Sequence, residues 1–76
     1  MMEIKIRDEY IRLGQAMKLA GLVENGVEAK DVITDGEVTV NGETETRRGK
    51  KLRDGDSFSY GGKTVTVRAG GGPTQE

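Results

Sequence analysis

The sequence predicts an α+β fold in which two short helices are followed by short strands. Apolar residues recur at three- and four-residue steps over residues 12–23 and again over residues 29–33, as on one face of an amphipathic helix. After residue 36 the repeat changes to two residues, which is typical of half-buried strands. With 76 residues the chain has room for one small domain, for which we expect the bounds 1–68.

A short strand at residues 3–7 comes first, because Ile4 and Ile6 alternate with charged residues. The first helix follows, and Gly21 is expected to end it because glycine tolerates the left-handed conformation of the C′ position. The buried face of this helix is predicted to contain Leu13, Ala16, Met17, Ala20 and Val23, widened by Leu19 and Leu22.

The second helix is expected to begin after Asn25, a good N-cap residue that is followed three residues later by Glu28, as in a capping box. Gly36 is expected to end it. The short link between the two helices predicts an αα-hairpin. The buried stripe of the second helix is predicted to contain Ala29, Val32 and Ile33.

A β-hairpin is expected next, because Asn41-Gly42 is a strong two-residue turn signal. Its first arm contains Val38 and Val40, which point to one side. The return arm, residues 43–46, has no large apolar residue, so we expect it to form an edge strand or an exposed arm.

Two further strands are predicted at residues 57–60 and 64–67, joined by a turn at Gly61-Gly62. A turn at residues 54–56 leads into the first of them. Residues 69–76 contain three consecutive glycines and the only proline, so we expect a disordered tail.

The residue inventory excludes much of enzyme chemistry. The chain has no cysteine and no histidine, which removes thiolate nucleophiles, cysteine zinc sites and imidazole bases. We therefore expect a binding module rather than an enzyme, with no catalytic residue, metal or cofactor. The longest apolar run is far shorter than the roughly 20 residues that cross a membrane, and no signal peptide opens the chain. We expect a cytoplasmic monomer with no membrane partner.

The net charge of −1 hides an uneven distribution. Residues 1–46 have 5 basic and 10 acidic side chains, a net of −5, and residues 54–76 have 2 basic and 3 acidic, a net of −1. Residues 47–53, here called the basic loop, have 5 basic side chains and none acidic. Because arginine and lysine both bind phosphate, this loop is a candidate site for a polyanion. The other interpretation is a solvated loop that protects an edge strand.

Two further motifs are interpreted as turns. Gly62-Lys63-Thr64 matches the end of a phosphate-binding loop, but Ser57 stands where the first glycine belongs and a strand follows instead of a helix. Asp54 and Asp56 flank a glycine, and the sequence identifies no third metal ligand to join them. We therefore expect a turn and not a metal site.

In the order and spacing of these elements the chain resembles the RNA-binding domain family named after small-subunit ribosomal protein S-four, especially its small stand-alone bacterial members. The resemblance covers about residues 10–60. It is carried by Arg12-Leu13, Gly21-Leu22, Ala29-Lys30, Ile33, Gly36, Val38, Val40-Asn41-Gly42 and Gly55-Asp56.

The resemblance implies an S-four-like fold with an αL motif, a two-helix hairpin packed on a small bent antiparallel sheet. It also implies that the helical face and the adjoining loop bind structured RNA, with ribosomal or transfer RNA as the first partners to expect. The residues it implies for RNA contact are Arg12, Lys18 and Lys30 on the helices and Arg47, Arg48, Lys50, Lys51 and Arg53 in the basic loop.

Three positions depart from the family pattern. Asn25-Gly26 stands where Ser-Arg is frequent, Asp31 replaces a basic residue, and Gly14 stands where aspartate is usual. The helical half of the interface is therefore poor in positive charge, and we expect the basic loop to supply more of the affinity.

Two functions of different classes follow. The first is a non-enzymatic RNA-binding module for which we expect a link to the ribosome or to translation. We expect it to recognise RNA shape and phosphates, because Tyr10, Phe58 and Tyr60 are too few and too scattered for base stacking. The second is a protein-interaction adaptor that uses the acidic helices or an edge strand. Binding that falls steeply with salt favours the first, and interactions that survive nuclease treatment favour the second.

Overall fold

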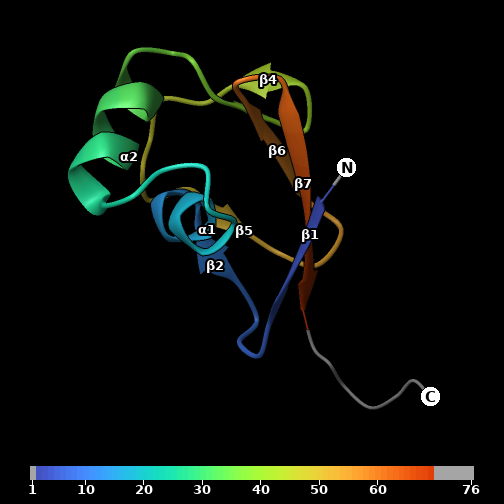
Figure 1. Cartoon of the computed structure of the whole chain (residues 1–76). Coiled ribbons are helices and arrows are strands. Elements are labelled where there is room, and N and C mark those ends of the chain that lie inside the picture. Colours follow the sequence, from blue (N-terminus) through green and yellow to red (C-terminus); the bar gives the residue numbers. More distant parts are fainter. Residues whose placement is uncertain (1, 70–76) are drawn as a thin grey trace.

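The computed structural model describes residues 2–69 and confirms the α+β class, with two helices packed beside a sheet (Figure 1). Residues 70–76, which make up nearly all of the predicted tail, lie outside the described residues. The elements are β1 (Met2–Ile6), β2 (Ile11–Arg12), α1 (Leu13–Leu19), α2 (Gly26–Thr34), β3 (Thr39–Val40), β4 (Glu43–Thr44), β5 (Lys51–Leu52), β6 (Ser57–Tyr60) and β7 (Lys63–Ala69).

The main sheet has the strand order β1-β7-β6-β3-β4, which places β4 at an edge as expected for the return arm. Strands β3, β4, β6 and β7 pair antiparallel, but β1 pairs parallel with β7, so the sheet is mixed and not wholly antiparallel as predicted. Almost the whole domain separates β1 from β7 along the chain, which gives the long crossover that a parallel pair requires.

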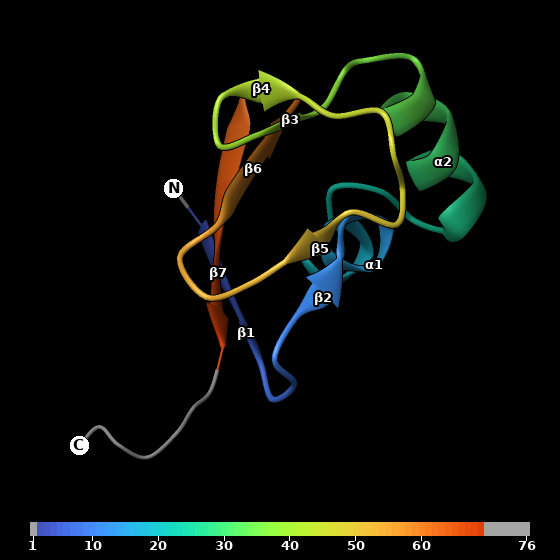
Figure 2. The ribbon, with the colours of Figure 1, turned by 180° about the vertical axis from the view of Figure 1, so that it is seen from behind.

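A second, two-stranded sheet was not predicted. Strands β2 and β5 pair antiparallel, with Ile11 opposite Leu52 and Arg12 opposite Lys51. This β2–β5 ribbon lies beside α1, between the helices and the main sheet (Figure 2). Leu52 is completely buried in the core, so the ribbon fixes the end of the basic loop against the body of the domain.

Helix α1 is shorter than its apolar pattern suggests because it ends in a Schellman motif. The amide of Leu22 donates to the carbonyl of Met17 (3.0 Å), and Gly21 has a φ of +77°. The prediction that Leu19 widens the buried face is wrong, since Leu19 is 57% exposed. Val23 is buried as predicted, but it lies beyond the end of the helix.

Helix α2 has the predicted N-cap. Asn25 Oδ1 accepts a hydrogen bond from the Glu28 amide (2.8 Å), and Glu28 Oε1 accepts one from the Glu24 amide (2.9 Å). The hairpin turn at Asn41-Gly42 is confirmed as well, with φ angles of +51° and +87°.

The predicted turn at residues 54–56 is confirmed, and its carboxylates are occupied by local hydrogen bonds. Asp56 accepts from the Arg53 amide (2.7 Å) and from Asn41 Nδ2 (3.1 Å), while Asp54 accepts from the Ala69 amide (3.0 Å). The side chains of both helices and both sheets meet in a single core that contains Ile4, Leu13, Ala16, Met17, Val23, Ala29, Ile33, Val38, Val40, Leu52, Phe58, Val65 and Val67.

Candidate nucleic-acid interface

The backbone of the basic loop is attached to the start of helix α1. A helix leaves its first amides without intrahelical partners, and the N-cap residue Arg12 makes no side-chain cap here. Two carbonyls of the loop accept hydrogen bonds from these amides in place of a cap, and the carbonyl between them accepts one from the Arg12 side chain. The bonds run from Leu13 N to Lys50 O (2.8 Å), from Arg12 Nη1 to Gly49 O (3.2 Å) and from Gly14 N to Arg48 O (3.1 Å).

Because the carbonyls of residues 48–50 face the helix, the loop has one fixed backbone conformation against α1. A free loop with five like charges would extend to relieve their repulsion. Hydrogen bonds to the start of the helix hold the basic loop in place. In this position Arg48 and Lys51 are exposed and Lys50 is half-buried.

Gly14 permits the close approach of the loop to the helix. A Cβ atom added at Gly14 would lie 2.9 Å from Cγ of Arg48, closer than such atoms normally come. Any larger residue therefore pushes the stem of Arg48 outward. The departure from the family pattern at this position is thus linked to the position of a basic side chain.

A groove between the two helices opens beside Arg48. Of the basic residues expected from the sequence, Arg12, Lys18 and Arg48 are brought together here. On the α2 side the lining consists of Gly26 and Ala29, which have no side chain beyond Cβ. The groove is lined by Arg12, Gly14, Gln15, Lys18, Gly26, Ala29, Arg48 and Gly49.

Lys30 does not line this groove. It is exposed on α2 four residues after Gly26, so both residues lie on the same side of that helix. Lys30 is the only basic residue of α2, and it is followed by the exposed Asp31. The α2 side of the interface is therefore poor in positive charge, as the sequence predicts.

The remaining cations of the basic loop line a separate hollow, made by Arg47, Gly49, Lys50, Lys51 and Arg53. Arg47 differs from the others because its Nε donates to Glu45 Oε2 (3.0 Å). This bond lowers the pKa of Glu45 below its ordinary value of 4.5 and raises the pKa of Arg47. The Arg47 side chain is 73% exposed, but its charge is balanced locally by Glu45, whose side chain is 13% exposed.

Tyr10 was considered from the sequence only as a base-stacking residue, but in the structure it lies among three of the candidate cations. Lys51 Nζ lies 4.7 Å from the centroid of the Tyr10 ring, and the guanidinium carbons of Arg53 and Arg12 lie 5.6 and 5.8 Å from it. We call these four residues the Tyr10 cluster. The signal was present in the sequence, since Tyr10-Ile11-Arg12 and Lys51-Leu52-Arg53 both place an apolar residue between polar ones.

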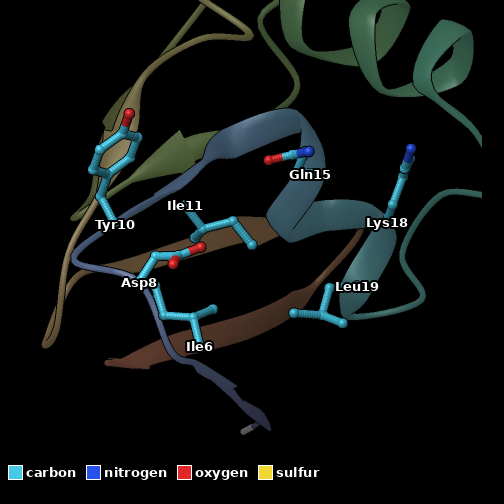
Figure 3. A pocket seen from close by; sticks show the side chains of 7 residues that line it. All are labelled: Ile6, Asp8, Tyr10, Ile11, Gln15, Lys18 and Leu19. Carbon is cyan, nitrogen blue, oxygen red and sulfur yellow. The ribbon is translucent and has the colours of Figure 1, made fainter. Parts of the chain in front are cut away.

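A second groove lies on the other side of α1, between that helix and the segment that joins β1 to β2 (Figure 3). Ile6 and Leu19 face each other across it, and the Tyr10 ring points away from this pair (Figure 3). Gln15 and Lys18 line both grooves, so the two are adjacent around α1. Gln15 was not singled out from the sequence, where it is one polar residue of an amphipathic helix.

Within residues 2–69 no group of three or more acidic, cysteine or histidine side chains is arranged to hold a metal ion. None of the described helices is long and apolar enough to cross a membrane. The chemistry of the surface around α1 is that of exposed cations on a fixed backbone, which suits the binding of phosphate groups.

Comparisons with known proteins agree on one family. A family model described as S4 domain matches residues 4–68. In Bacillus subtilis, the protein named "Probable ribosome maturation protein RlbA" is 47% identical over 53 residues, which are 70% of this chain and 75% of that protein. YbcJ of Escherichia coli is 38% identical over 60 residues, which are 79% of this chain and 86% of YbcJ.

YbcJ also has a solution structure that is similar to this one. The TM-score is 0.71 at 34% sequence identity, and the match covers 91% of this chain and 89% of YbcJ. That structure is described as revealing an αL motif involved in RNA binding. The αL-type fold expected from the sequence is therefore confirmed.

Proposed function

Because this chain belongs to the S4 domain family, we propose that it is a non-enzymatic protein that binds structured RNA through the basic loop and the groove beside it. The observation that carries the proposal is the attachment of the loop to α1 by three consecutive carbonyls. A loop held in this way presents its cations without a large ordering cost on binding.

Phosphate contacts are proposed as the main source of affinity. Phe58 is buried in the core and Tyr60 is half-buried against it, so these two rings do not form an exposed platform for base stacking. The cations proposed to contact phosphates lie in the basic loop, next to it at Arg12, and on the two helices. They are Arg12, Lys18, Lys30, Arg48, Lys50, Lys51 and Arg53, with Arg47 available after release from Glu45.

Ribosomal RNA is the first partner to test and transfer RNA the second. The similarity to RlbA, whose printed name refers to ribosome maturation, supports this order. Both RNAs are folded and present the closely spaced phosphates of A-form helices, which a rigid cationic loop suits better than a flexible single strand. The proposal includes a monomer that acts where these RNAs are found, in the cytoplasm.

The experiment is a titration of folded ribosomal RNA fragments and transfer RNA with the full chain at several salt concentrations. If about five phosphates are neutralised, the slope of log K against log salt should lie at roughly −3.5 to −4.5. A slope near zero, or no binding to either RNA, would contradict the proposal. Partner proteins that remain bound after nuclease treatment would instead identify the chain as a protein-interaction adaptor.

A further inference from the structure

The β2–β5 ribbon has one face toward the core and one face toward solvent. Ile11 and Leu52 lie opposite each other, and both pack in or against the core. Successive side chains of a strand point to opposite faces, so the residues on either side of this pair point outward. Extending the register places Tyr10 opposite Arg53, next to the pair of Arg12 and Lys51.

On the outer face the aromatic ring is the contact that the three cations share. The two ion pairs between described side chains, Arg47–Glu45 and Arg68–Glu3, include none of them. Arg12 has one further bond, to the Gly49 carbonyl. The Tyr10 ring thus draws together side chains whose charges would otherwise keep them apart.

An aromatic ring orders a cation without cancelling its charge. Glu45 orders Arg47 by an ion pair, but this ion pair already balances the charge of Arg47 in the absence of RNA. The ring of Tyr10 has no net charge, so Lys51 and its neighbours remain available to phosphates. The ring itself adds no negative charge to the cluster, and the nearby carboxylates of Asp8 and Glu9 line a hollow together with Tyr10 and Arg12.

We propose that Tyr10 is a positioning residue of the RNA interface, which gathers three cations into a phosphate-binding point on the β2–β5 ribbon, next to the groove between the helices that Arg12 also lines. This inference rests on the proposed function. Ordering a long cationic side chain on binding costs roughly 2- to 12-fold in Kd, and Tyr10 removes part of that cost for three of them. The Tyr10 ring acts through the cations and does not itself stack on a base.

The test compares Tyr10→Leu, which removes the ring, with Tyr10→Phe, which keeps it. With folded ribosomal RNA fragments, Tyr10→Leu should weaken binding by about 10-fold and Tyr10→Phe by less than about 2-fold. The salt slope of Tyr10→Leu should equal that of the parent because no charge is lost. Lys51→Met, in contrast, should reduce the slope by about 0.7 to 0.9.

A double-mutant cycle separates positioning from a general structural effect. In a Lys51→Met/Arg53→Met background, Tyr10→Leu should have little further effect on RNA affinity, because the side chains it positions are gone. An equal loss in both backgrounds would overturn the inference. It would also be overturned by parent-like binding of Tyr10→Leu, or by a loss confined to RNAs with unpaired bases.

The cluster can also be observed without RNA. Ring currents should shift the ε-methylene protons of Lys51 upfield in the parent and in Tyr10→Phe, and the shift should vanish in Tyr10→Leu. Unshifted protons in the parent would overturn the inference while leaving RNA binding untouched. If the parent shows the shift but binds no RNA, the proposed function fails instead.

Discussion

The two sides of the groove between the helices have similar backbone structure. They differ in their positive charge and in the hydrogen bonds that hold them in place. On one side, α1 and the basic loop bring together Arg12, Lys18 and Arg48, and three loop carbonyls bond to the helix start. On the other side, α2 contributes Gly26 and Ala29 to the lining and Lys30 nearby. The positive charge is therefore concentrated on the side where hydrogen bonds hold the backbone in place. We expect mutations on the two sides to change RNA affinity by very different amounts.

The largest effect is expected from reversing the basic loop. Replacing Arg47, Arg48, Lys50 and Lys51 with glutamate should weaken RNA binding by more than roughly 100-fold, because four of the eight proposed phosphate contacts become repulsive. The matched control changes the net charge equally at exposed cations elsewhere, Lys5, Arg7, Lys63 and Arg68. Fluorescence anisotropy with one folded RNA measures both variants. An equal loss in the two would mean that net charge, and not the loop, determines affinity.

Substituting one glycine on each side of the groove compares the two sides directly. Gly14→Ala places a Cβ against the Arg48 side chain, whereas Gly26→Ala meets nothing within 4 Å. Gly14→Ala should weaken RNA binding by about 5- to 10-fold through displacement of the loop, and Gly26→Ala by less than about 2-fold. The free energy of unfolding of both variants should stay within about 1 kcal/mol of that of the parent, because alanine also favours the helix. Similar affinities for the two variants would contradict the role given to Gly14.

Truncating single basic side chains should show the same difference in RNA affinity between the two sides, with smaller changes. Arg48→Ala should weaken binding by about 3- to 10-fold and Lys30→Ala by about 2-fold, since Lys30 lies outside the groove. The salt slope should fall by about 0.7 to 0.9 for Arg48→Ala and by less for Lys30→Ala. A larger loss for Lys30→Ala would place the main contact on α2 and reverse the comparison.

The one gain in affinity that we expect comes from Glu45, whose ion pair balances the charge of Arg47. Glu45→Gln releases Arg47 from its ion pair and should tighten RNA binding by about 3-fold, with a steeper salt slope. An unchanged affinity would show that Arg47 points away from the RNA.

The same pair predicts a pH dependence of stability. The pKa of Glu45 is lowered in the folded chain, so its stabilising contribution is complete above about pH 4.5 and is lost as pH falls through the lowered pKa. Thermal unfolding of Glu45→Gln should lack this part of the acid sensitivity. The effect should be small, because Arg47 is exposed to solvent.

Local patterns in the sequence predicted much of the fold. Asn25 and Gly21 mark helix ends through short-range bonds, and Asn41-Gly42 marks a hairpin through its backbone angles, so each is readable from a few neighbouring residues. The resemblance to the S-four family was correct for the same reason, because its motifs are largely such local signals.

The long-range pairings could not be predicted in this way. The parallel pairing of β1 with β7 and the bond from Gly14 to Arg48 join residues far apart in sequence, and no local period encodes either. The exposure of Leu19 likewise depends on where α1 ends against its neighbours. The basic loop was identified from composition alone, but its fixed backbone and its link to Tyr10 required the structure.

The central claim is that a basic loop fixed against α1 is the RNA-binding surface. Backbone amide chemical-shift mapping of the full chain during titration with a folded ribosomal RNA fragment tests it most directly. We expect the largest changes in residues 47–53, at the start of α1 and in β2, with smaller changes in α2. Changes centred on β4 or on the acidic residues of α2, with the basic loop unaffected, would contradict it.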